Sequence, residues 1–300
     1  MTRVALLPLG VRPFLADAVR EGGGVVVDVD AADALVWTSA TGGAALRDAL
    51  SPRIRWVQLP WAGIEPFVDV LDHARLWTAG QGVYAEPVAE HALALMLAGL
   101  RCLKLRATAT SWQPPSGQSL FHARVTLVGA GGIAQSLAAL LQPFRVQLTV
   151  VRRRLEPFPH AVRTRPRADL AVAVADADVV VLACALTAAT RGVIDARVLG
   201  AMKKTAWLVN VARGALVDTA ALVDALGAQA IGGAGLDVTD PEPLPAGHPL
   251  WSSPRCLITP HVGNTPEMAV PLLSARVRDN VRRFGAGEPM LGVVDVAAGY

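Results

Sequence analysis

The sequence predicts an α/β fold in two domains, each built around a parallel sheet. Its 300 residues exceed the usual size of a single domain. Short apolar runs alternate with helical segments along most of the chain, as strands and crossover helices do in parallel sheets. A glycine-rich turn at residues 129–134 lies between one apolar run and the helix that follows it. Together these observations predict doubly wound sheets with helices on both faces.

The composition is that of a globular protein, because hydrophobic residues make up 52% of the chain and charged residues 18%. No run approaches the roughly 18 uninterrupted apolar residues of a spanning helix, and residues 1–9 lack the features of a signal peptide. The net charge of +3 is too small to indicate nucleic-acid binding. Three cysteines, Cys102, Cys184 and Cys256, lie far apart, which fits a reducing compartment. We therefore expect a cytoplasmic protein that binds neither membranes nor nucleic acids.

The first part of the chain predicts a small α/β unit followed by a long helix. Four apolar runs indicate strands, at residues 4–9, 24–29, 35–38 and 55–59. Helical segments are expected at residues 13–21 and 43–50. A long helix is expected over residues 86–107, where Pro87 suits the first turn, before a loop at residues 112–117.

A second α/β series begins at Arg124 and predicts a larger sheet. Its expected strands are residues 125–128, 147–151, 179–183, 206–210, 231–236 and 257–259. A last helix is expected over residues 266–284, and the tail at residues 289–300 has no assigned partner. The alternation of strands and helices in this half favours a doubly wound parallel sheet.

The turn after the first strand of this series carries a phosphate-binding fingerprint. It reads Gly129-Ala130-Gly131-Gly132-Ile133-Ala134, with an apolar strand before it and an Ala- and Leu-rich helix after it. Gly129 permits the tight turn, Gly131 lets the backbone approach a pyrophosphate, and Gly132 and Ile133 open the helix whose amides attract it. A structural turn or a methyltransferase loop is the alternative, but the strand–turn–helix context favours dinucleotide binding.

The end of the next strand indicates which dinucleotide is bound. An acidic residue normally binds the ribose hydroxyls there, about 20 residues after the glycines, but this strand ends in Arg152-Arg153-Arg154. Guanidinium groups bind a 2′-phosphate by charge-assisted hydrogen bonds, whereas a carboxylate would repel it. We therefore expect NADP(H) in preference to NAD(H), with Arg152 as the first contact and Arg153 as the next. A solvated basic turn that leaves NAD(H) possible is the alternative.

Three polar segments follow predicted strand ends in the second series, where open parallel sheets bind ligands. They are residues 209–214, 236–243 and 258–261, and shorter blocks lie at residues 62–64, 88–91, 186–190 and 248–251. In this order, these blocks resemble those of the D-isomer-specific 2-hydroxyacid dehydrogenases, over most of the chain from Trp56 to Asn280. The resemblance implies an oxidoreductase that interconverts a 2-oxo acid and its 2-hydroxy acid with a nicotinamide cofactor.

The resemblance maps the catalytic positions onto Arg213, Glu242 and His261, and the chemistry of these side chains suits the roles. The planar fork of Arg213 can hold the substrate carboxylate and polarise the 2-oxo group. His261 can donate a proton to the carbonyl oxygen as hydride arrives from the cofactor. Glu242, if it lies beside the imidazole, would favour the charged form of that ring. Each residue alone has a plain structural interpretation, so the hypothesis depends on their joint occurrence in order.

Secondary contacts follow from the same resemblance. Asp237 would bind the nicotinamide carboxamide, and backbone groups around Ala212 and Cys184 would line the cofactor groove. The turn Ala62-Gly63-Ile64 would hold the substrate carboxylate with its amides. Trp61 beside this turn either walls the pocket or packs in the core.

Other polar positions are expected to have no catalytic role. Glu90 and His91 begin a helix and are interpreted as structural, and the thiol of Cys184 as a small buried hydrophobe. No spacing of His, Cys or Asp predicts a metal site. The chain departs from the family pattern at Glu65, where many members carry Asp, at Cys184-Ala185-Leu186-Thr187, which lacks the usual Pro, and at Gly132, which replaces a larger residue. These departures weaken any transfer of substrate identity.

The implied architecture is a doubly wound Rossmann cofactor domain, residues 91–286, inserted into a smaller flavodoxin-like substrate domain formed by residues 1–90 and 287–300. The active site is expected in the cleft between the domains. Because the family commonly dimerises through cofactor-domain helices, a homodimer is expected.

The resulting functional hypothesis is a reductase of a small 2-oxo acid, of the glyoxylate or hydroxypyruvate type, because an NADP(H) preference suits a reductase. A relative of formate dehydrogenase is one alternative, but that class has Gln beside its His, so Glu242 counts against it. A non-catalytic nucleotide-sensing interaction protein, like the family's corepressors, is another alternative that the three residues leave open.

Overall fold

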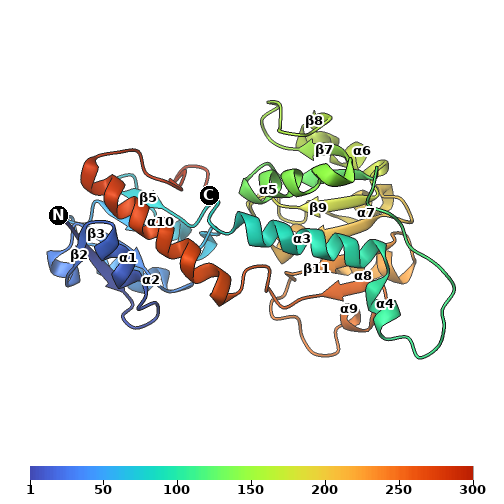
Figure 1. The fold of residues 1–300 in the computed structure, drawn as a ribbon, viewed down its shortest axis with the longest axis horizontal. Helices are drawn as coiled ribbons and strands as arrows, with labels where there is room; N and C mark the ends of the chain where they lie inside the picture. The colour runs from blue at the N-terminus through green and yellow to red at the C-terminus, as the bar shows by residue number, and fades with distance from the viewer. Residues whose placement is uncertain (300) are drawn as a thin grey trace. The chain divides into compact units, whose positions relative to one another are not determined.

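The computed structural model describes residues 1–299, which form two compact units (Figure 1). Unit 1 contains Met1–Tyr84 and the residues from Thr265 onward, and unit 2 contains Ala85–Asn264. The sequence-based boundaries lie after residues 90 and 286, whereas the units change after residues 84 and 264. The difference arises because the last helix packs with the N-terminal residues, with the Phe284 ring 5.3 Å from that of Trp56.

Unit 1 is built on a five-stranded parallel sheet in the order β2-β1-β3-β4-β5. The strands are β1 Thr2–Leu7, β2 Gly24–Val26, β3 Ala34–Trp37, β4 Trp56–Gln58 and β5 Leu76–Thr78. This order is the flavodoxin-like one, with its topological switch between β1 and β3. The predicted flavodoxin-like fold of the smaller unit is therefore confirmed.

Helices cover both faces of the unit 1 sheet. Helices α1 (Leu15–Glu21) and α10 (Pro266–Ala286) pack together on one face, and α2 (Gly43–Ala49) and the 3₁₀ turn Glu65–Val70 lie on the other. Asn280 of α10 is fully buried, and its Nδ2 donates to Oε1 of Gln58 at 2.8 Å. This buried hydrogen bond ties α10 to the end of β4, so the bond would be costly to break.

The C-terminal tail has a partner that sequence analysis leaves unassigned. The amide of Val294 donates to the carbonyl of Trp77 at 2.9 Å, and the amide of Ala79 donates to the carbonyl of Gly292 at 2.8 Å. The tail thus runs along the outer side of β5, a strand that sequence analysis also does not predict. Val294 is buried there, which fixes the tail within unit 1.

Unit 2 contains a seven-stranded parallel sheet in the order β12-β11-β10-β9-β6-β7-β8. The strands are β6 Arg124–Val128, β7 Gln147–Val151, β8 Arg163–Arg165, β9 Val179–Leu182, β10 Trp207–Asn210, β11 Gly233–Leu236 and β12 Cys256–Ile258. The order reverses between β6 and β9, as in a doubly wound Rossmann sheet. The predicted fold class is confirmed, and edge strand β8 is one strand more than sequence analysis predicts.

Two layers of helices bury this sheet (Figure 1). Helices α3 (Ala85–Leu100) and α5 (Gly132–Leu140) lie over one face. Helices α6 (Leu170–Ala175), α7 (Ala196–Ala201) and α8 (Thr219–Gly227) lie over the other. Every residue of β9 and β10 is buried, which explains why these strands are uniformly apolar apart from Asn210.

The expected long helix over residues 86–107 is wrong as a single element. Helix α3 ends at Leu100, and a short helix α4 follows at Leu103–Ala107. Cys102 between them has φ 52, in the left-handed region that interrupts a helix. The carbonyl of Leu100 accepts the amide of Gln118 at 2.8 Å instead of continuing the helical ladder. The remaining short helix of unit 2 is α9, Pro249–Ser252.

Candidate active site

The candidate site residues of unit 2 gather at one edge of its sheet. They follow the carboxyl ends of β6, β7, β9, β10, β11 and β12, all parallel strands. Open parallel sheets bind ligands at this edge, next to the switch point, which here lies between β6 and β9. The sheet topology therefore brings sequence-distant segments to the edge where chemistry is expected.

The glycine turn after β6 has the geometry that a dinucleotide phosphate requires. Gly129 has φ +120, its amide donates to the carbonyl of Val151 at 2.9 Å, and a Cβ there would overlap the backbone of Ala183. No side chain caps the start of α5 at Gly132, and a Cβ on Gly131 would meet nothing within 4 Å. Uncapped amides beside open space are what an anion needs at a helix N-terminus. The residues present therefore fit a pyrophosphate.

Arg152 lies directly after β7, next to Val151, whose carbonyl accepts the amide of Gly129. Its side chain is only 19% exposed, and Nη2 lies 3.4 Å from Oε2 of Glu156. Its amide donates to the carbonyl of Arg165 on β8 at 3.0 Å. The basic end of β7 thus lies beside a second basic strand, and the side chain of Arg153 is exposed.

Cys184 follows β9 and packs against the apolar cluster on the α6–α8 face. Burial raises the pKa of its thiol to about 11, with a smaller opposing effect from its own backbone amide and from Arg167. A thiol in this state is a poor nucleophile near neutral pH. The structure agrees with the interpretation of this side chain as a small hydrophobe, and shows it to be partly buried.

The loop after β10 presents Arg213 and is shaped by a buried amide. Asn210 is fully buried, its Nδ2 donates to the carbonyl of Arg213 at 2.8 Å, and its Oδ1 accepts the amide of Ala212 at 3.1 Å. The guanidinium of Arg213 donates from Nη1 to the carbonyl of Ala212 at 2.7 Å. Sequence analysis assigned no role to Asn210, although it ends a strand in the middle of a recognised block.

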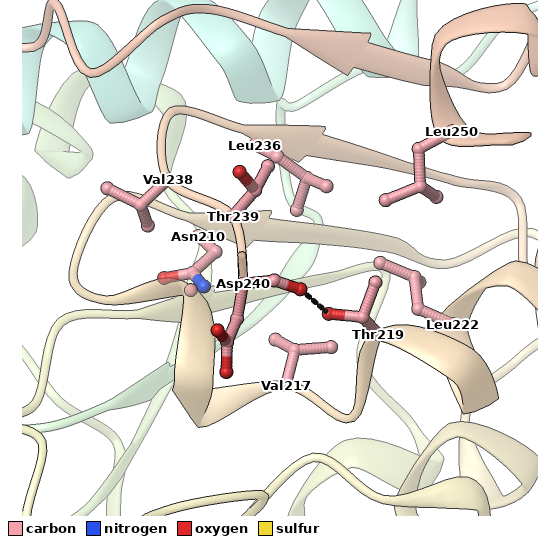
Figure 2. Close-up of a pocket in the computed structure, with 10 residues that line it drawn as sticks. Asn210, Val217, Thr219, Leu222, Leu236, Val238, Thr239, Asp240 and Leu250 are labelled. Carbon is pink, nitrogen blue, oxygen red and sulfur yellow. Dashed lines mark hydrogen bonds between the residues drawn. The ribbon is translucent and has the colours of Figure 1, made fainter. Parts of the chain in front are cut away.

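The Arg213 loop packs directly against the loop after β11. A Cβ on Gly214 would overlap the carbonyl of Thr239, so only glycine allows this approach. Figure 2 shows the small pocket that remains between the two loops, where Thr219 Oγ1 donates to the carbonyl of Asp240 at 2.7 Å. Its lining is mostly apolar and comprises Asn210, Gly214, Val217, Thr219, Leu222, Leu236, Val238, Thr239, Asp240 and Leu250. None of the three predicted catalytic residues lines this pocket, so we interpret it as packing that supports the loops.

His261 and Glu242 lie side by side, as the catalytic hypothesis requires. Nδ1 of His261 is 2.6 Å from Oε1 of Glu242, and the side chains are 53% and 40% exposed. His261 has φ 54, in the left-handed region that histidine adopts more readily than most residues but still seldom. Backbone held in this region is often found at functional sites.

Asp237 holds the turn that carries His261. Its Oδ1 accepts the amide of Val262 and its Oδ2 the amide of Gly263, both at 2.9 Å, while its own carbonyl accepts the amide of His261 at 2.8 Å. Thr259 Oγ1 donates to Oδ1 at 2.6 Å. Burial of the carboxylate would raise its pKa, but these hydrogen bonds and one from His91 outweigh burial and lower the pKa to about 2. The carboxylate is therefore a structural centre of the turn, and its predicted contact with a carboxamide stays a prediction.

His91 of α3 reaches the same carboxylate from another element. Its Nε2 is 2.9 Å from Oγ1 of Thr259 and 3.2 Å from Oδ1 of Asp237. Sequence analysis interpreted His91 as structural and did not connect it with the site. His91 and Thr259 are 168 residues apart in the sequence, so only the fold reveals their contact.

The predicted carboxylate turn Ala62-Gly63-Ile64 belongs to unit 1. The carbonyl of Trp61 accepts the amide of Gly80 at 2.8 Å, which fixes the start of the turn. Within residues 1–299, the amides of Ala62, Gly63 and Ile64 donate no hydrogen bond. Three consecutive unused amides suit an anionic acceptor, and the role of this turn stays a prediction.

Within residues 1–299, no helix is both long and apolar enough to cross a membrane. In the same part of the chain, no group of three or more His, Cys, Asp or Glu side chains is arranged to hold a metal ion.

The chain is similar in sequence to a known protein family and to individual relatives. A sequence model of the family described as D-isomer specific 2-hydroxyacid dehydrogenase, NAD binding domain, matches residues 92–263. A Corynebacterium melassecola relative, described as the uncharacterized protein in the proB 3′ region, is 40% identical and covers 94% of this chain and 95% of its own length. The human glyoxylate reductase/hydroxypyruvate reductase is 36% identical over 60% of this chain, and the match spans 56% of that protein's length.

The fold has a solved counterpart with a bound cofactor. A D-isomer specific 2-hydroxyacid dehydrogenase from Xanthobacter autotrophicus Py2, in complex with NADPH and MES, superposes with a TM-score of 0.87 at 25% identity, covering 100% of this chain and 99% of that one. A sheet of this order with an uncapped glycine turn is typical of dinucleotide-binding proteins. Since the family model covers more than half of its length, this chain belongs to the D-isomer-specific 2-hydroxyacid dehydrogenase family.

Proposed function

We propose that this protein reduces a small 2-oxo acid to the 2-hydroxy acid with NADPH, in the manner of a glyoxylate/hydroxypyruvate reductase. The observation that carries the proposal is the 2.6 Å contact between His261 Nδ1 and Glu242 Oε1 at the ligand-binding edge of the sheet. The glyoxylate reductase/hydroxypyruvate reductase activity named for the human relative supports the substrate type. A non-catalytic nucleotide-sensing protein is not favoured, because the human and Klebsiella pneumoniae relatives are named as reductases.

The proposed chemistry assigns one role to each of three side chains. The guanidinium of Arg213 pairs with the substrate carboxylate and polarises the 2-oxo group. His261 donates a proton from Nε2 to the carbonyl oxygen, while Glu242 accepts the Nδ1 proton and so orients the ring. The reduced nicotinamide supplies the hydride when it is bound. The free amides of the turn Ala62-Gly63-Ile64 are proposed to hold the carboxylate.

The cofactor would be held mainly by backbone groups. We assign the pyrophosphate to Gly129, Gly131, Gly132 and Ile133, where the open space over the α5 N-terminus supports binding of an anion. Backbone groups at Cys184 and Ala212 would line the groove, and Asp237 would receive the carboxamide. The 2′-phosphate is assigned to Arg152 and Arg153, which makes NADP(H) the preferred cofactor and leaves NAD(H) possible.

A homodimer is the second part of the proposal. The segment of residues 108–119 after α4 contains no helix or strand (Figure 1). It carries Trp112, whose side chain is fully exposed. Leu103, Leu105 and Phe121 beside this segment are about half exposed. Exposed apolar side chains of this size are typical of interfaces. Sedimentation velocity of the wild type and of Trp112→Ser tests the proposal: a wild-type monomer at micromolar concentration would overturn it.

A cytoplasmic location is the third part of the proposal. It is supported by the three cysteines, which are free thiols in the structure, as is usual in a reducing compartment.

The deciding experiment follows NADPH and NADH oxidation separately with glyoxylate, hydroxypyruvate and pyruvate. We expect turnover that favours NADPH and that falls by about 100-fold or more in His261→Ala, because general acid catalysis contributes about 10²- to 10⁴-fold. The control is His73→Ala, which removes an exposed imidazole from unit 1. Tight cofactor binding with no turnover of any 2-oxo acid would overturn the enzymatic proposal.

A further inference from the structure

An arginine of unit 1 lies at the edge of its sheet where ligands are expected. Arg12 follows β1, and its Nε donates to the carbonyl of Thr38, after β3, at 2.8 Å. Thr38 Oγ1 in turn donates to the carbonyl of Pro8 at 2.6 Å. The loops after β1 and β3 are thus bonded together at the topological switch of the sheet, which is the ligand-binding position of such folds.

An aromatic platform holds the guanidinium of Arg12. The central carbon of this group lies 4.5 Å from the ring centroid of Trp61. The Trp61 ring packs at 5.5 Å against that of Tyr84, whose hydroxyl donates to the carbonyl of Pro60 at 2.7 Å. The cation is therefore fixed by one hydrogen bond and one cation–π contact, and its position is well defined.

The charge of Arg12 is not balanced by an acid of the chain. Within residues 1–299, no carboxylate forms an ion pair with it, and its two terminal nitrogens donate no hydrogen bond. Burial lowers the pKa of this guanidinium, and its one opposing neighbour is Tyr84, whose own pKa burial raises to about 12. A partly buried cation without a counter-ion gains stability from an incoming anion.

A neighbouring arginine shows what a purely structural role looks like in this unit. Arg276 of α10 is also partly buried and also faces Tyr84. It uses both terminal nitrogens within the chain, donating to the carbonyl of Ala79 at 2.9 Å and to that of Gln81 at 3.0 Å. Arg12 instead uses Nε for the chain and leaves its bidentate fork available.

We propose that Arg12 binds a second acidic group of the substrate, so that the preferred substrate is a 2-oxo acid with an additional carboxylate or phosphate. Trp61, on which the guanidinium lies, directly precedes the turn Ala62-Gly63-Ile64 with its unused amides. The inference rests on the proposed function, in which Arg213 and this turn already serve the first carboxylate. A further cation beside the turn then matches a substrate with one more negative charge.

The test compares 2-oxo acids that differ in the second group. Glyoxylate and hydroxypyruvate lack an acidic one, oxaloacetate and 2-oxoglutarate carry a carboxylate, and phosphohydroxypyruvate carries a phosphate. NADPH oxidation is measured for the wild type, Arg12→Met and Arg12→Lys, with Arg20→Gln as control. Arg20 is exposed on α1, and its one ion-pair partner in the described part of the chain is neighbouring Asp17. Arg20→Gln therefore removes one positive charge from the same unit at a distance from the proposed site.

We expect the wild type to have its highest kcat/KM with one of the diacids, and the identity of that acid distinguishes carboxylate from phosphate. Arg12→Met should lower the ratio of kcat/KM for that acid to kcat/KM for glyoxylate by about 10- to 100-fold, the usual effect of a lost charge-assisted hydrogen bond. The loss should lie mainly in KM. Arg12→Lys should recover part of the ratio, because it keeps the charge without the fork, and Arg20→Gln should keep the wild-type ratio.

Two results would overturn the inference while the proposed function stands: better turnover of glyoxylate or hydroxypyruvate than of every diacid, or an unchanged ratio in Arg12→Met. Turnover of no 2-oxo acid at all would instead overturn the proposed function, and with it the substrate class inferred from Arg12.

Discussion

Nδ1 of His261 lies 2.6 Å from Oε1 of Glu242, although the two residues belong to loops after different strands, β12 and β11. A carboxylate at Nδ1 accepts the proton there and leaves Nε2 to exchange a proton with another molecule. The turn that carries His261 is held by Asp237, and Asp237 is held by His91. The orientation of the imidazole thus depends on a chain of hydrogen bonds that reaches from the exposed edge to the partly buried side chain of His91 in the second turn of α3.

Glu242→Gln is expected to lower kcat by about 10- to 100-fold, as the loss of an orienting partner does. The neutral amide keeps the size of the side chain but replaces the charged acceptor at Nδ1 of His261 with a neutral one, so the ring is held less firmly. Steady-state kinetics with NADPH should show the loss in kcat with little change in the KM for NADPH. Glu90→Gln makes the same change at an exposed position of α3 and serves as the control. Full activity in Glu242→Gln would contradict the role given to this pair.

His91→Phe is expected to lower kcat by about tenfold, because it removes the donor that supports Asp237 and Thr259. His91 touches neither cofactor nor substrate in this proposal, so it is a positioning residue. His91→Gln keeps a donor of similar reach and should recover most of the activity. A purely structural residue would lower stability in both variants without a difference in kcat, and that pattern in kinetics and thermal unfolding would refute the positioning role.

Strands and motifs were predictable from the sequence wherever one segment carried the whole signal. The strands β6, β7, β9 and β10 can be recognised from their apolar runs, because a strand buried on both faces is mostly apolar. The glycine turn and the segments that contain Glu242 and His261 are similarly local. β8 is not predictable because it reads Arg-Thr-Arg and has no apolar residue, as an exposed edge allows. β5 is not predictable because its apolar run is only Leu76-Trp77, between Arg75 and Thr78.

The rest depends on contacts between segments far apart in the chain. Nothing near His91 in sequence indicates its contact with Asp237, and nothing near Arg12 indicates the ring of Trp61. The break between α3 and α4 is also non-local, because the amide of Gln118 takes the carbonyl that would have continued the helix. Such positions can be recognised only once the topology has brought their partners together.

Asp237 should make stability depend on pH in the acid range. Its folded-state pKa of about 2 lies below the ordinary 3.8, so the unfolded state binds the proton more readily. The stabilisation is present in full above about pH 4 and is lost as the pH falls through about 2; the difference corresponds to about 2 kcal/mol. Urea unfolding measured between these pH values should show that the free energy of unfolding falls more steeply with decreasing pH for the wild type than for Asp237→Asn. Exposed Asp30→Asn should behave as the wild type, and equal slopes in all three proteins would contradict the prediction.

Two glycines of the phosphate turn should respond to alanine in opposite ways. Gly129→Ala places a Cβ against the backbone of Ala183 at a φ of +120, so a loss of about 2 kcal/mol or more in unfolding free energy is expected. Gly131→Ala meets no atom within 4 Å, so its stability should stay near that of the wild type. The new methyl group would nevertheless occupy the space over the α5 amides, and the Kd for NADPH should rise by about tenfold or more. Calorimetric binding and thermal unfolding of both variants would separate the two effects; unchanged NADPH affinity in Gly131→Ala would exclude a phosphate at this turn.

Arg152→Ala is expected to raise the KM for NADPH by about 10- to 100-fold and to change the KM for NADH far less, because a guanidinium–phosphate contact is lost with one cofactor only. In the structure this guanidinium lies beside Glu156, whose carboxylate would compete with a 2′-phosphate for the same N–H groups. Glu156→Gln removes that competition, so it should lower the KM for NADPH or leave it unchanged. It should not lower the KM for NADH. Arg154→Ala, at the exposed end of the same arginine run, is the matched control for charge alone. If Arg152→Ala and Arg154→Ala affected NADPH and NADH equally, the run of arginines would be a solvated basic turn, and the preference for NADP(H) would have to come from elsewhere in the site.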